Sequence, residues 1–226
     1  FAFIFSILAA YYIIRSVRDG MSSDWSDAEL STIWTFTFFI SFLVVSFYGY
    51  ICSKVKFKYL VPGVYGFFAL SFVLLFLLIN FFPELNLINQ IFYVWVSVFS
   101  LLNISVFWSF MADTYNKEQA KRLFAFIASG SSLGAIFGPT ISLIFASRLG
   151  SESLVLISAV MLIIPLMIAI YLNKIKATDL DNTSSSEFNE NEMSGNFWDG
   201  FAELLKPPLA KNILLGIGIF IVLYSG

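Results

Sequence analysis

The sequence has no histidine and a single cysteine, Cys52, among its 226 residues. The absence of histidine excludes Ser-His-Asp and Cys-His catalysis, His-ligated zinc and multi-His iron sites. A lone cysteine forms neither an intrachain disulfide nor a cysteine-based metal site, and we interpret Cys52 as a packing residue. No lysine or pair of carboxylates lies within an apolar block either. We therefore predict that the protein is not an enzyme and has no cofactor and no metal.

Charged residues are also scarce. They make up 12% of the chain, against 58% hydrophobic and 19% aromatic residues, whereas a soluble domain has about 25% charged residues. The net charge is −2 and the basic residues are dispersed over short loops, which argues against nucleic-acid binding. This composition predicts a protein whose main partner is the lipid bilayer.

Long apolar blocks dominate the rest of the sequence. Each has about the 20 residues that a helix needs to cross a hydrocarbon core about 30 Å thick. The predicted spans two to six cover approximately residues 33–52, 59–82, 88–111, 123–146 and 154–172. The first block, 1–14, is shorter, and no small-residue cleavage site of a signal peptide follows it. We interpret it as a truncated first span, so that 1–172 forms an all-α, six-helix transmembrane bundle.

A polar stretch over 173–211 separates this bundle from a further apolar run. It is rich in Ser, Asn and acidic residues, which predicts a flexible cytoplasmic linker. Within it, large apolar residues recur at helical spacing and predict a short amphipathic helix on the membrane surface, although a collapsed linker is the alternative. They are Phe197, Trp198, Phe201, Leu204 and Leu205. Residues 212–226 begin a predicted seventh transmembrane helix.

The distribution of lysine and arginine predicts the orientation, because cytoplasmic loops retain positive charge. Ten basic residues fall on one side of the predicted membrane and three on the other. The larger group is Lys54, Lys56, Lys58, Lys117, Lys121, Arg122, Lys174, Lys176, Lys206 and Lys211; the smaller is Arg15, Arg18 and Arg148. We expect the linker and the N-terminus to be cytoplasmic.

The predicted fifth span carries Gly130, Gly134 and Gly138, followed by Pro139. Glycines at every fourth position line one helix face and let a neighbouring helix approach closely, while proline kinks a helix. The pattern is typical of a helix that moves. Ordinary packing of small residues explains it equally well.

Three charged residues, Arg15, Arg18 and Asp19, follow the first apolar block. Arginines three apart share a helix face and suit a carboxylate or a phosphate. A charge at the centre of a membrane helix costs about 2.5 to 3.5 kcal/mol on insertion scales and usually marks function. We predict substrate binding or coupling for all three; the alternative is that the arginines reach the outer interface with Asp19 as partner.

A second charged group, Asp113, Lys117 and Arg122, follows the predicted fourth span. Asp113 and Lys117 have i,i+4 spacing, which suits a pair that latches a cytoplasmic gate. A solvated pair worth well under 1 kcal/mol is an equal alternative. Arg122 is either part of the gate or an interfacial anchor of the fifth span.

Six helices, a long linker and a seventh helix resemble the N-terminal half of the major facilitator superfamily. Gly-Ala-Ile-Phe-Gly-Pro at 134–139 is similar to the span-five signature of its antiporters, and the loop 49–58 keeps the Gly and the basic residues of the family's Gly-x-x-x-Asp-Arg-x-Gly-Arg motif but not its Asp or second Gly. Residues 15–19, 107–113 and 121–124 resemble a bacterial branch related to ATP/ADP translocases.

The resemblance implies a bacterial inner-membrane secondary transporter that works by alternating access between two six-helix halves. It further implies exchange of a nucleotide or another small anionic solute, with the partner C-terminal half outside this chain. Two other functions remain open. Proton-coupled efflux of a hydrophobic compound would depend on Asp19 or Asp113, and a membrane scaffold would bind no solute.

Overall fold

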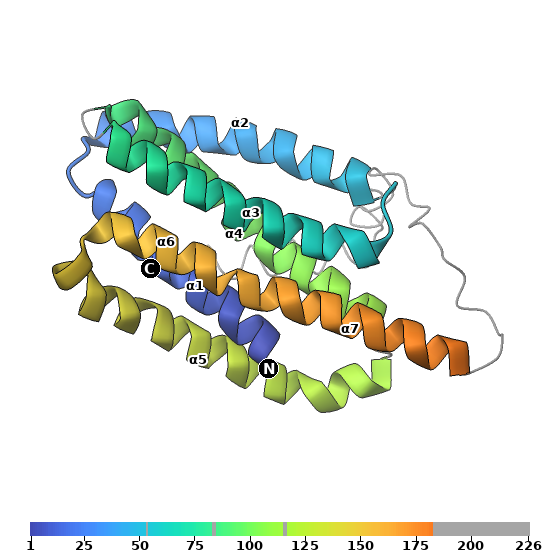
Figure 1. The fold of residues 1–226 in the computed structure, drawn as a ribbon. Coiled ribbons are helices and arrows are strands. Elements are labelled where there is room, and N and C mark those ends of the chain that lie inside the picture. Colours follow the sequence, from blue (N-terminus) through green and yellow to red (C-terminus); the bar gives the residue numbers. More distant parts are fainter. Residues whose placement is uncertain (53, 83–84, 115–116, 183–226) are drawn as a thin grey trace, which may run out of the picture.

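The computed structural model describes residues 1–52, 54–82, 85–114 and 117–182, and within these ranges every element is an α-helix. The helices are α1 (Ala2–Met21), α2 (Asp27–Cys52), α3 (Phe57–Phe81), α4 (Asn86–Thr114), α5 (Lys117–Leu149), α6 (Ser151–Met161) and α7 (Ile163–Asn182). They form one bundle, with α2 along one edge and α5 along the opposite edge (Figure 1). The predicted all-α fold is confirmed.

Five stretches of the described helices are long and apolar enough to cross a membrane. They are Asp27–Cys52, Lys58–Phe81, Asn86–Met111, Arg122–Leu149 and Ser151–Ile175. These stretches correspond to the predicted spans two to six, and α1 stands in the place of the first. The predicted seventh span and most of the predicted linker lie outside the described residues.

The observed helices extend beyond the apolar blocks, because backbone hydrogen bonding does not require apolar side chains. α2 begins at Asp27, six residues before the predicted span. Its start is stabilised by a capping box, in which the backbone N–H of Ser26 donates to Glu29 Oε2 at 2.9 Å and the N–H of Glu29 to Ser26 Oγ at 3.4 Å. At the other end of the bundle, α7 continues to Asn182 rather than ending near Leu172.

The sixth predicted span is interrupted at Leu162, where α6 ends and α7 begins. Pro165 explains the interruption, because it has no N–H for the carbonyl of Met161 and its ring displaces that carbonyl. The next hydrogen bond, from the N–H of Leu166 to the carbonyl of Leu162, is long at 3.4 Å. α6 and α7 nevertheless follow one another in one line, between α3 and α5 in the view of Figure 1.

α1 occupies the centre of the bundle. It packs most extensively against α5 and α6 and also against α4 and α7, whereas α2 packs chiefly against α4. Aromatic side chains of α1, α3 and α4 fill the core, as in the 5.6 Å contact of Phe3 with Tyr65 and the 4.9 Å contact of Phe68 with Phe99. The outer face of α2 stays exposed and suits lipid; it carries Phe36, Phe38, Phe39, Phe42, Leu43 and Phe47.

A proline inside α3 determines one contact between α3 and α7. Pro62 has no N–H, so the carbonyl of Lys58, four residues earlier, loses its usual helix partner. The side-chain amide of Asn173 in α7 donates Nδ2–H to that carbonyl at 3.0 Å. The beginning of α3 is thereby joined to α7.

Candidate functional site

The three charged residues predicted on the first span form one cluster on α1. Arg18 donates from Nε and Nη2 to Asp19 Oδ1 at 2.9 and 2.7 Å. Arg15 donates from Nε to the other oxygen, Asp19 Oδ2, at 3.3 Å. One carboxylate therefore serves two guanidinium groups, and the cluster has a net charge of about +1.

The two arginines differ in exposure. The side chain of Arg18 is 14% exposed, whereas that of Arg15 is 44% exposed. Arg15 lies over the ring of Tyr12 with its guanidinium carbon 5.8 Å from the ring centroid. Arg18 is therefore held inside the bundle, while Arg15 is accessible.

Arg18 reaches across to α4. Its Nη1 donates to Ser97 Oγ at 3.3 Å, and its guanidinium carbon lies 5.1 Å from the ring centroid of Tyr93. The hydroxyl of Ser97 donates its own hydrogen to the carbonyl of Tyr93 at 2.9 Å. The lone pairs of Ser97 Oγ are thus left to accept from the arginine.

Tyr93 in turn contacts α2 and the segment before it. Its hydroxyl accepts a hydrogen bond from Trp34 Nε1 at 2.9 Å. The ring of Trp25 lies 5.5 Å from the Tyr93 ring, measured between centroids. We call Tyr93, Ser97 and Trp34 the Arg18 support; it joins α1, α2 and α4.

The depth of the cluster follows from its partners on α4. Arg18 lies in the last turn of α1, but Tyr93 and Ser97 lie about two and three turns after the start of α4 at Asn86. At 1.5 Å per residue this places them roughly 10 and 16 Å along the helix. The guanidinium of Arg18 therefore points into the bundle, against two groups that lie well inside α4.

The glycines of α5 face α1. A Cβ on Gly134 would lie 2.6 Å from the carbonyl oxygen of Phe5, and one on Gly138 would lie 2.6 Å from Tyr12 Cβ. Gly130 is slightly less constrained, with Phe1 O and Ile4 Cγ2 each 3.0 Å from such a Cβ. The backbone of α5 therefore approaches the backbone of α1 closely, with no side chain of these glycines between them. Whether α5 also moves stays a prediction.

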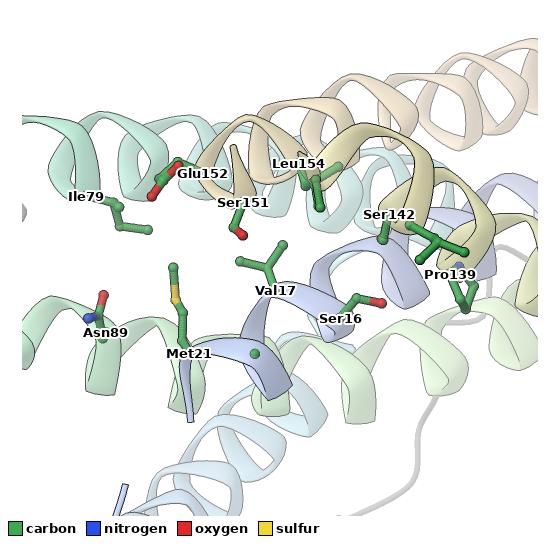
Figure 2. Close-up of a pocket in the computed structure, with 13 residues that line it drawn as sticks. Ser16, Val17, Met21, Ile79, Asn89, Pro139, Ser142, Ser151, Glu152 and Leu154 are labelled. Carbon is green, nitrogen blue, oxygen red and sulfur yellow. The ribbon is translucent and has the colours of Figure 1, made fainter. Parts of the chain in front are cut away.

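Pro139 and Ser142 of α5 border a cavity of about 580 Å³ between the helix ends near α1. Figure 2 shows Val17, Met21 and Ser151 directed toward the same space. Its other lining residues are Ser16, Gly20, Ile79, Asn89, Leu143, Ala146, Glu152 and Leu154. None of the three charged residues of α1 lines it, so this cavity and the Arg15–Arg18–Asp19 cluster occupy different faces of α1.

The predicted cytoplasmic gate is only partly described. Asp113 lies in the last turn of α4 and Lys117 begins α5, but their side chains lie outside the described residues. Arg122 is exposed in the second turn of α5. The role of these three residues in a gate stays a prediction.

Sequence reasoning missed the Arg18 support. A weak signal was available, since Tyr93 and Ser97 are four residues apart and therefore share a face of α4. Nothing in the sequence indicated which helix this face meets. Within the described residues, no group of three or more Asp, Glu, Cys or His side chains is arranged to hold a metal ion.

Comparison with known proteins gives one result. The family model described as the Major Facilitator Superfamily matches residues 1–226. No curated protein matches the chain, and no solved structure matches it. The apolar spanning helices agree with the family match. The chain therefore belongs to the Major Facilitator Superfamily, a family of multi-pass membrane proteins that act as secondary transporters.

Proposed function

We propose that this transporter carries a small anionic solute by alternating access, and that Arg15 and Arg18 bind it. The observation that carries the proposal is the shared carboxylate. Two guanidinium groups with one Asp19 leave a net positive charge on a helix at the centre of an apolar bundle. An anionic solute would balance this charge.

The remaining donors of the cluster support the same assignment. Within the described residues, Asp19 and Ser97 accept hydrogen bonds from three of the five N–H groups of Arg18. The other two N–H groups remain available to a bound solute. Arg15 is accessible and three residues away on the same side of α1. A carboxylate or phosphate could contact both arginines at once.

Exchange between two anions is the transport mode that we favour, with a nucleotide or another phosphorylated metabolite as the first candidates. The support is the similarity of residues 134–139 and 15–19 to antiporters and to ATP/ADP translocases. The close crossing of α5 on α1 would allow the two helices to shift as a pair. The resemblance to the bacterial translocase branch implies a bacterial inner membrane. The basic loops favour an orientation with the linker and the N-terminus in the cytoplasm.

The test is thermal unfolding of the purified full-length protein in detergent with nucleotides, other phosphorylated metabolites, carboxylates and lipophilic cations. Binding to the folded state raises Tm. We expect stabilisation by at least one class of anion, and its loss in Arg18→Ala. Arg148→Ala is the matched control, because Arg148 is an exposed arginine in the last turn of α5. Stabilisation only by lipophilic cations would favour efflux, and none at all would favour a scaffold.

A further inference from the structure

We propose that Tyr93 is a positioning residue for Arg18: its ring holds the guanidinium in place, and its hydroxyl fixes the ring through Trp34. The proposal rests on the function proposed above. It assigns residues of α2 and α4 to a site that the sequence placed on α1 alone. The positioning itself is testable without knowledge of the solute.

The geometry shows how each atom contributes. An arginine attracted to the face of an aromatic ring is stabilised by the ring quadrupole, and more strongly where water is excluded. The guanidinium carbon of Arg18 is 5.1 Å from the Tyr93 centroid, and Ser97 Oγ accepts from Nη1 at 3.3 Å. The Tyr93 ring and the Ser97 hydroxyl thus hold the same guanidinium on the α4 side, while Asp19 binds it from α1.

Trp34 prevents the ring from turning away. Its Nε1–H donates to the Tyr93 hydroxyl at 2.9 Å, and an indole N–H has no acceptor lone pair, so the direction of this bond is settled. A change in the position of α2 relative to α4 would therefore move the ring, and with it Arg18. The Arg18 support thereby links the charge on α1 to α4 and, through Trp34, to α2.

The test measures how fast each arginine reacts with phenylglyoxal in the full-length protein, by mass spectrometry of the modified peptides. In the wild type we expect Arg18 to react more slowly than Arg15, because it is held and less exposed. Tyr93→Leu removes the ring and should raise the rate at Arg18 by about 3- to 30-fold. Tyr93→Phe keeps the ring and should restore most of the protection. Trp34→Phe should give a small increase.

Arg148 supplies an internal control, since its rate should be the same in every variant. Tyr59→Leu supplies a matched control, because Tyr59 also carries a cation over its ring, Lys58 at 5.0 Å. Tyr59 lies in the first turn of α3, which begins at the opposite end of the bundle from the end of α1 that carries Arg18 (Figure 1). An unchanged Arg18 rate in Tyr93→Leu would overturn the proposal. If Tyr93→Leu fails to fold, as shown by the loss of its thermal unfolding transition, the decision passes to Trp34→Phe and Ser97→Ala, and unchanged Arg18 rates in both would overturn the proposal.

The same assay separates this proposal from the one on which it rests. ATP and inorganic phosphate added to the wild type should slow modification of Arg15 and Arg18 if these anions bind there. If neither protects, and no anion raises Tm, the anionic solute is wrong while the positioning of Arg18 by Tyr93 can still hold. If anions protect but Tyr93→Leu leaves Arg18 unchanged, the positioning is wrong and the anion site stands.

Discussion

Asp19 is the counter-ion of both arginines of α1, because within the described residues it forms an ion pair with Arg15 and another with Arg18. Its side chain is 51% exposed, so each pair is partly screened by solvent. The main contribution of Asp19 is therefore to the net charge of the Arg15–Arg18–Asp19 cluster. Without it, the cluster would change from a net charge of +1 to +2.

We predict two effects of Asp19→Asn. Stability should fall by about 1 kcal/mol, because the largely buried Arg18 loses its counter-ion. The rise in Tm caused by a bound anion should become larger than in the wild type, since the anion then balances a larger charge. Melting curves with and without the stabilising anion measure both effects. A smaller anion effect in Asp19→Asn would instead indicate that Asp19 itself contacts the solute or a coupling proton.

The sequence predicted the charged residues of this cluster but not the residues that surround them. The spacing of Arg15, Arg18 and Asp19 was enough to predict that they act together. Tyr93, Ser97 and Trp34 could not be predicted as their neighbours, because the contacts join residues 59 to 79 positions apart. Such contacts depend on the offset between packed helices, which local spacing does not encode.

The α1–α5 crossing belongs to the scale of elements. Gly138→Ala would place a Cβ 2.6 Å from Tyr12 Cβ and 2.9 Å from the carbonyl oxygen of Ala9. Because backbone cannot yield as a flexible side chain does, we predict destabilisation by about 1 to 3 kcal/mol. Thermal or denaturant unfolding in detergent measures it.

Gly63→Ala is the matched control for this substitution. Gly63 lies inside α3, and a Cβ there meets nothing within 4 Å. Alanine favours helix over glycine by up to about 1 kcal/mol, so this variant should be as stable as the wild type or more so. Equal losses in both variants would show that the close approach of α1 to α5 does not matter.

The contact between α3 and α7 yields a second prediction for elements. Asn173→Ala should destabilise the bundle by about 1 kcal/mol, because the Lys58 carbonyl then loses the donor that replaces the missing N–H of Pro62. In a Pro62→Ala background the helix supplies its own N–H, so the same substitution should cost less. A double-mutant cycle in unfolding free energy measures the difference.

Asn80→Ala is the control for that cycle. Asn80 also donates Nδ2–H to a carbonyl, that of Phe76 at 2.8 Å, and both bonds are exposed, but the Asn80 bond lies within α3 and joins no second helix. Its removal should change stability by a few tenths of a kcal/mol at most. If Asn173→Ala costs as much in the Pro62→Ala background as in the wild type, the account of the freed carbonyl is wrong.

At the scale of the whole molecule, the alternation of helices leaves the α1–α2 and α2–α3 connections on opposite sides of the bundle. We predict that the second is cytoplasmic, because it carries Lys54, Lys56 and Lys58. Ser23 and Val55 are exposed positions, one in each connection. They are suited to a labelling test once Cys52, the single cysteine of this sequence, has been replaced by alanine.

A membrane-impermeant maleimide should label Ser23→Cys in intact cells, and Val55→Cys only after the membrane is permeabilised. Cys52→Ala alone supplies the background signal. The reverse pattern would invert the orientation that we propose, and with it the assignment of the Asp113 region to the cytoplasmic side.

By itself, the sequence determined that this protein lies in a lipid bilayer and that its fold is all-α. Apolar blocks of about 20 residues form spanning helices, because a helix satisfies the hydrogen bonds of its own backbone and unpaired N–H and C=O groups in lipid raise the free energy. It also placed charges on α1 and small residues on one face of α5. Only the tertiary structure decided that the glycines meet α1, that α1 is central and that Arg18 rests on Tyr93. Those contacts depend on how helices distant in sequence pack together. In lipid, this packing arises from close van der Waals contact and hydrogen bonds between helices, and the pattern of apolar residues along the chain does not predict it.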